Sequence, residues 1–187
     1  RWAVVWSNEV GGSARNVEGR FFDRAGVQQG AGFTVGSAGA APDSWAIEPR
    51  TTALQDGGLA VLWGHYDTAT QTSARVQFVN ADGSLRGAVT PLSGTWVGDI
   101  ATLADGRVAV ASVDGGRLFT AVFAASGSLL VPDVLVTAAR DSQAPTVRVA
   151  ASGDGYVVTW TQPVLGAPQA VVMQRFVAIT ALTWLGL

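Results

Sequence analysis

The chain has 187 residues and a formal net charge of −2; 48% of its residues are hydrophobic and 14% are charged. This composition excludes a disordered chain, and the length suits a single domain, 1–187, with a substantial core. The basic residues are isolated arginines, so we expect no nucleic-acid partner. With no cysteine and one histidine, we expect no disulfide, metal site or cofactor. No apolar run approaches the ~20 residues of a membrane helix.

A strand that ends in tryptophan recurs along the chain. Its copies are Trp2–Trp6, Leu59–Trp63, Arg107–Ala111 and Tyr156–Trp160. The last three follow an Asp-Gly pair, which predicts a hairpin turn because glycine accepts the positive φ that tight turns require. The third copy carries Ala111 where the others carry tryptophan.

A second column keeps the same period. An aromatic segment closed by glycine follows each of the first three tryptophan positions, at Phe21–Gly26, Phe78–Gly83 and Val122–Gly127. In the fourth copy Phe176 has the expected spacing, but Thr180 replaces the glycine. Two columns with one period indicate a true internal repeat.

Each copy divides into four short strands. The first precedes the Asp-Gly turn, and the second, which ends at the tryptophan position, is apolar throughout, as is typical of a strand buried on both faces. The third alternates between apolar and polar residues, as in 74–78, which is typical of a half-buried strand. The fourth follows the second glycine.

The repeat predicts an all-β fold, and a β-propeller of about four four-stranded antiparallel blades fits it best. The copies span approximately 1–45, 46–94, 95–143 and 144–187. A β-trefoil, or part of a larger ring, is the alternative. Copy 1 lacks its first strand and copy 4 lacks a recognisable fourth strand. The tail Val177–Leu187 departs from the repeat, either as a divergent closing strand or because the chain is a fragment.

The repeat resembles a known group of sequences. Its consensus is Asp-Gly-Gly, a β-branched run, Trp, and then Gln-Arg-Phe-Asp-x-x-Gly, carried here by Asp56–Trp63, Phe22–Gly26, Asp141–Pro145 and Asp154–Trp160. It is similar to the repeats of large secreted bacterial proteins of the RTX (haemolysin-type) adhesin group. The resemblance implies a propeller-like or stacked-β module outside the cell or on its surface. The calcium-binding nonapeptides of such proteins are absent, so it does not imply bound calcium.

Trp45 and Trp96 are the candidate ligand-binding residues. Both lie in predicted loops outside the repeated tryptophan column, where exposed aromatic rings stack on sugar rings or on side chains of a protein partner. The alternative is that each ring caps the end of its own blade. His65, Tyr66 and Asp67 pair a histidine with a carboxylate, but no serine or second acid completes a catalytic set, so we interpret them as a solvated loop.

The aspartates of the repeated turns, Asp56, Asp105 and Asp154, are explained by turn chemistry. No catalytic residue is therefore assigned. The favoured hypothesis is a non-catalytic binding or adhesion module, extracellular or surface-attached. One alternative is a set of structural blades that oligomerise to close a ring, because incomplete end sheets leave unpaired edges. Another is a glycoside hydrolase or lyase on a propeller scaffold.

Overall fold

The computed structural model describes residues 1–11, 14–37, 44–67, 72–138, 146–164 and 167–177. All its regular elements are strands, which confirms the predicted all-β class. The strands are β1 (Trp2–Gly11), β2 (Ala14–Phe22), β3 (Gln28–Gly36), β4 (Trp45–Ala53), β5 (Leu59–Tyr66), β6 (Ser73–Val79), β7 (Leu85–Pro91), β8 (Trp96–Thr102), β9 (Val108–Asp114), β10 (Arg117–Phe123), β11 (Leu129–Ala138), β12 (Val147–Ser152), β13 (Gly155–Val164) and β14 (Ala167–Val177).

Consecutive strands pair antiparallel in four groups, which we call meanders one to four. Meander one is β1–β3, meander two is β4–β7, meander three is β8–β11 and meander four is β12–β14. A single parallel bridge, between Arg15 and Trp45, links the first two. Meander one thus lacks a first strand. In meander four the tail after Val177, for which the sequence left a divergent closing strand or a fragment open, lies outside the described residues.

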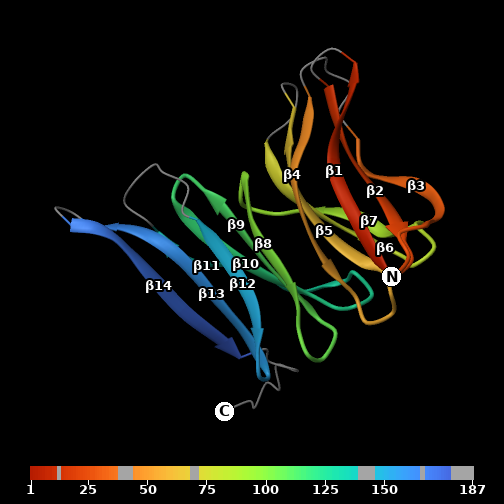
Figure 1. The fold of residues 1–187 in the computed structure, drawn as a ribbon. Helices are drawn as coiled ribbons and strands as arrows, with labels where there is room; N and C mark the ends of the chain where they lie inside the picture. The colour runs from red at the N-terminus through yellow and green to blue at the C-terminus, as the bar shows by residue number, and fades with distance from the viewer. Residues whose placement is uncertain (12–13, 38–43, 68–71, 139–145, 165–166, 178–187) are drawn as a thin grey trace.

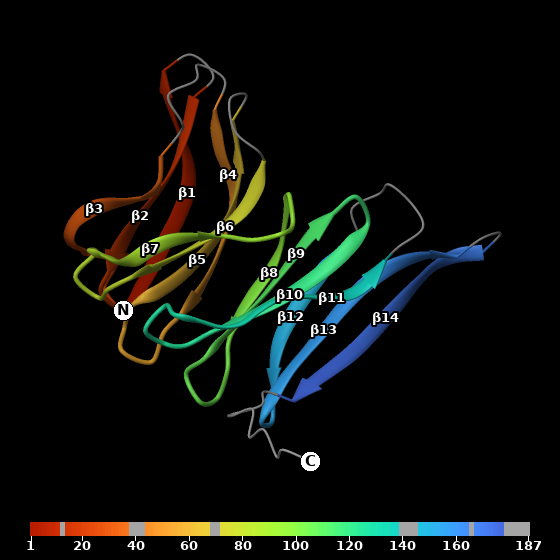
Figure 2. The ribbon, with the colours of Figure 1, turned by 180° about the vertical axis from the view of Figure 1, so that it is seen from behind.

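The meanders stand side by side in chain order, with β1–β3 at one end of the molecule and β14 at the other (Figures 1 and 2). Their first strands are neighbours, since β4 contacts β8 and β8 contacts β12. Among the described strands no sheet closes on itself. Within the described residues no helix has the length and apolar character needed to cross a membrane.

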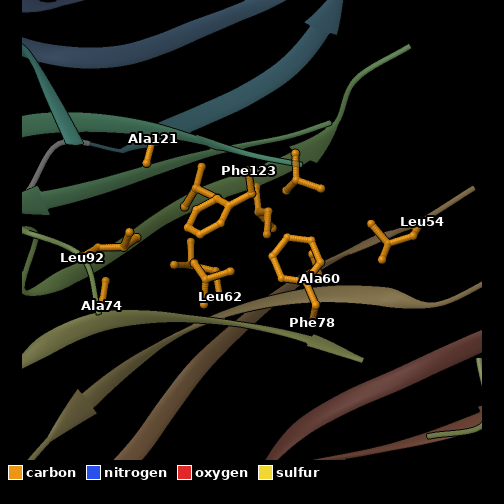
Figure 3. Packing of buried hydrophobic residues seen from close by; sticks show 12 residues of the cluster. Leu54, Ala60, Leu62, Ala74, Phe78, Leu92, Ala121 and Phe123 are labelled. Carbon is orange, nitrogen blue, oxygen red and sulfur yellow. The ribbon is translucent and has the colours of Figure 1, made fainter. Parts of the chain in front are cut away.

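A separate hydrophobic core fills each of the three spaces between neighbouring meanders. Between meanders two and three, Leu62 and Phe78 point toward Phe123 from the opposite sheet (Figure 3), and the two phenylalanine rings lie 5.7 Å apart. In β5 and β9, successive side chains point to opposite faces, and both faces are covered. This is why these strands read as unbroken apolar runs.

The register corrects the repeat alignment in the third copy. Gly57 and Gly106 both have φ +85° in the turns that precede β5 and β9, so they are the equivalent glycines. The alignment from sequence matched Gly58 to Gly106 and was therefore shifted by one residue. The third copy of the tryptophan column is Ser112, not Ala111.

The strands also continue beyond the tryptophan column instead of ending there. Trp6, Trp63 and Trp160 each lie inside their strand. Trp63 and Trp160 are buried against the preceding meander, whereas Trp6, which no described meander precedes, is only partly covered. The second column is confirmed as a turn, because Gly26, Gly83 and Gly127 all have φ between +83° and +93°.

Replacing Trp63 with alanine is expected to lower the free energy of unfolding by about 3–5 kcal/mol, because a buried indole is lost and a cavity is left. Trp63 is 1% exposed and Trp96 is 51% exposed. The control Trp96→Ala is expected to cost less than half as much. Denaturant titrations measure both values, and equal losses would contradict the assignment of Trp63 to the core.

A second stability prediction concerns Gly36, which lies against the indole of Trp63. A Cβ at Gly36 would come within 2.7 Å of that ring, so Gly36→Ala must displace packed atoms and is expected to cost about 1–3 kcal/mol. Gly32 on the same strand is the matched control, because its Cβ would meet nothing closer than 3.5 Å. Thermal unfolding of the two variants is expected to show a lowered midpoint for Gly36→Ala alone.

Candidate functional site

A groove of about 260 Å³ opens between meanders two and three, where β4 begins, β5 ends and β8 begins. Trp45 and Trp96, predicted separately from the sequence, both line it. The structure thus places the two candidate residues in one site, although they lie in different meanders. The lining residues are Trp45, Ile47, Glu48, Gly64, His65, Tyr66, Thr72, Thr95, Trp96 and Val97.

Aromatic rings form one wall of this groove. Trp45 pairs with Tyr66 across β4 and β5, and their ring centroids lie 5.2 Å apart with the planes inclined by 30°. Trp96, at the start of the first strand of the next meander, also lines the groove and is 51% exposed. The exposed rings of Trp45 and Tyr66 offer flat apolar surface that the core does not use.

The two strands that carry these tryptophans are both bulged at the groove. In β4 the register shifts between Ile47 and Arg50, so Glu48 and Pro49 together face one residue of β5. In β8 the register shifts between Val97 and Asp99. Bulges bend a strand and redirect its side chains, and they are common next to binding sites.

Glu48 is strained. Its φ is +53°, a left-handed conformation that costs energy in a residue other than glycine. A following proline adds to the restriction, because it disfavours compact conformations in the residue before it. The strain is maintained by the surrounding strands, and it holds a carboxylate in the wall of the groove.

His65 corrects the sequence interpretation. Its side chain lies on the face of β5 that is turned away from the groove toward meander one, the same face as its cross-strand partner Ala46 and as Trp63. It lies within β5 and is 4% exposed, and Asp67 directly after the strand is also buried, so the segment is not a solvated loop. Burial lowers the pKa of His65, and the charge of Arg75 lowers it further, while the charge of Asp67 opposes this shift. Burial also lowers the pKa of Arg75. His65 is therefore held in its neutral form.

A second hollow adjoins the groove and shares Thr72 and Thr95 with it. It measures about 430 Å³ and has a polar rim. Thr95 Oγ1 lies 3.2 Å from Asp114 Oδ1, and the same aspartate forms an ion pair with Arg117 at 2.6 Å. The remaining lining residues are Ser73, Leu92 and Ser93. The aromatic groove thus continues into a hydroxyl-rich surface.

The recurrent turn aspartates lie away from this groove and serve the turns. Asp56 accepts a hydrogen bond from the Gly58 N–H at 2.9 Å, and Asp105 accepts one from the Arg107 N–H at 3.1 Å. These bonds, with the neighbouring arginines, lower the pKa of both carboxyls. Asp154 pairs with Arg175 at 2.6 Å. In the described part of the chain, no group of His, Asp and Glu side chains is arranged to hold a metal ion.

The sequence identified the two tryptophans but not Glu48, Tyr66 or His65 as residues of one groove. The sequence offered little signal for His65 and Tyr66, because Gly64 directly follows Trp63 and β5 nevertheless continues through it to Tyr66. No signal marked Glu48, because its position depends on a bulge set by packing between sheets.

No protein-family model matches the chain, and no curated protein matches it. Several solved structures resemble it in part, among them the following two. The polysaccharide lyase Uly1 is 9% identical with a TM-score of 0.45, over 92% of this chain and 45% of the lyase. The alpha-L-arabinofuranosidase from Lactobacillus brevis is 13% identical with a TM-score of 0.43, over 94% of this chain and 72% of that enzyme. The chain therefore spans less than half of the lyase, and both scores are too low to transfer a fold or an activity.

Protonation of His65 is expected to make stability depend on pH. The unfolded chain binds a proton at the ordinary histidine pKa of 6.5, whereas the folded chain binds it only at lower pH. Stability is therefore at its full value above this pH and falls as the pH drops below it. Urea titrations from about pH 7.5 to about pH 5.5 are expected to show a declining midpoint.

The matched control is His65→Gln, which keeps a polar side chain of similar size without a titrating group. Since His65 is the only histidine of the chain, the decline in this pH range is expected to disappear in the variant. A decline of the same size in both proteins would show that other groups cause it.

Proposed function

We propose that this chain is a non-catalytic carbohydrate-binding module on a β-propeller scaffold, and that the groove of Trp45, Tyr66 and Trp96 is its binding site. The observation that carries the proposal is that three exposed aromatic residues line one groove between two meanders, two of them in ring contact. Aromatic rings pack against the C–H faces of sugar rings, and burial of these faces from water favours binding. The four successive antiparallel meanders support the propeller scaffold.

The charge of the groove favours an uncharged glycan. Among the lining residues that the structure describes, Glu48 is the only carboxylate, and none is a lysine or an arginine that could neutralise an acidic sugar. The adjoining hollow offers threonine and serine hydroxyls, which hydrogen-bond to sugar hydroxyls. An oligosaccharide that extends from the rings into the hollow fits this arrangement better than a single sugar.

The resemblance of the repeats to those of secreted adhesins supports a location outside the cell or on its surface. A surface module with one aromatic groove binds one glycan chain per copy. Tight attachment then depends on several copies acting together.

Catalysis at the same groove is the second candidate function. It is favoured by Glu48, a carboxylate among the lining residues. Glycoside hydrolysis generally uses two carboxyl groups, however, and the lining residues supply one. Release of reducing ends from a bound glycan, abolished by Glu48→Gln, would replace the binding proposal with a hydrolase.

Binding is tested by titration calorimetry with uncharged oligosaccharides from xylan, arabinan and cellulose, and with polygalacturonate as the acidic probe. We expect an uncharged glycan to bind without cleavage and polygalacturonate not to bind. Trp45→Ala and Trp96→Ala are each expected to raise the Kd at least about tenfold, which corresponds to about 1.4 kcal/mol.

The control is Trp2→Ala, which removes an exposed tryptophan of β1 that does not line the groove. It is expected to leave the Kd unchanged. Equal weakening by Trp2→Ala and Trp96→Ala would indicate nonspecific adsorption to exposed aromatics, and the absence of binding to every uncharged glycan would reject the proposal.

A further inference from the structure

The two end meanders expose faces that the repeat normally buries. In meander one, β1 turns Ala3 and Val5 toward meander two, so Trp2, Val4 and Trp6 lie on the opposite face. In meander four, Val172 and Phe176 of β14 pack toward meander three. The opposite face of β14 therefore carries 171, 173, 175 and 177, and three of these four residues are exposed apolar side chains, namely Val171, Met173 and Val177.

The β1 face corresponds to a face that is buried in every later meander. By strand register, Val4 is equivalent to Val61, Val110 and Val158, all of which are 0% exposed against the preceding meander. Val4 itself is 41% exposed. Trp2 stacks on Phe22 with 4.3 Å between the ring centroids, which gives the face a flat aromatic surface.

The exposed face of β14 corresponds to a face that the following meander covers elsewhere in the chain. Met173 pairs with Thr159, and this pair is equivalent to Val76 with Leu62 in meander two. Val76 is 1% exposed because meander three covers it, whereas Met173 is 68% exposed. The β14 face is thus the side that receives a following meander, and the β1 face is the side that receives a preceding one.

We propose that these two faces bind each other between copies of this chain, so that β14 of one protomer packs against β1 of another in a head-to-tail contact. The argument is one of continuity. In each described space between meanders, the face that one meander turns toward the next packs against the face that the next meander turns back toward it. A second copy presents to β1 the face of its own β14, and to β14 the face of its own β1. Exposed contiguous apolar surface generally marks an interaction site. Such a contact is heterologous, and it builds a ring where the rotation closes.

This geometry differs from a symmetric contact in which identical faces meet. A symmetric contact through β1 would leave β14 exposed, and a symmetric contact through β14 would leave β1 exposed. Only the head-to-tail contact uses both faces. The proposal is independent of carbohydrate binding, because the end faces and the groove share no residue.

The experiment uses one charged substitution on each face. Val4→Glu places a carboxylate opposite Arg20 on β2, and Met173→Glu places one on the same exposed face of β14 as Arg175, whose guanidinium also pairs with Asp154. Unfolding midpoints are compared first to establish that both variants fold. Light scattering at micromolar concentration is expected to show a multimeric wild type and two monomeric variants.

Mixing the variants gives the decisive measurement. Val4→Glu retains a native β14 face and Met173→Glu retains a native β1 face, so native mass spectrometry of the mixture is expected to show a one-to-one heterodimer. A monomeric wild type overturns the proposal. So does a variant that remains dimeric alone, because it reveals a symmetric contact through the unmodified face. A mixture that stays monomeric while the wild type associates also overturns it.

Discussion

Packing of one sheet against the next is the constraint on which the rest of this structure depends. The second strand of an inner meander, such as β5, is apolar on both faces, and such a strand is stable only when a sheet covers each side. Each meander therefore requires a neighbour before and after it. This requirement sets the side-by-side order of the meanders, divides the core into three separate clusters, and leaves the end faces of β1 and β14 incompletely covered.

The same packing creates the groove. Sheets that pack through their middles diverge toward their ends because strands twist, and the groove lies at such an end, between β4 and β8. The bulges at Glu48 and Val97 fall in these two strands and turn side chains away from the regular pleat. Both bulges thus lie where two sheets separate, which leaves room for a ligand.

Much of the fold was predictable because it rests on local rules. Alternation gave the strands, and glycines with positive φ marked turns, as at Gly83 and Gly127. The sequence alignment placed Ala111 instead of Ser112 in the tryptophan column. The reason is that two adjacent glycines, Gly57 and Gly58, allow two alignments with Gly106, and only the backbone conformation distinguishes them. The site was only partly predictable. Trp45 and Trp96 stood out as tryptophans outside the repeat, but their convergence depends on contacts between sheets that no local pattern encodes.

The groove residues also indicate how many sites the molecule carries. Strand register makes Tyr66 equivalent to Glu9 in meander one and to Gly115 just after β9, and it makes Trp96 equivalent to Ile47. None of the aromatic wall is therefore repeated at the neighbouring interfaces in the described chain. The repeated positions are those that sheet packing uses, whereas the groove is built from positions at which the copies differ. A fold that repeats its core while varying its strand ends can carry a groove of its own composition without disturbing the packing that stabilises it, as the proposed single binding groove requires.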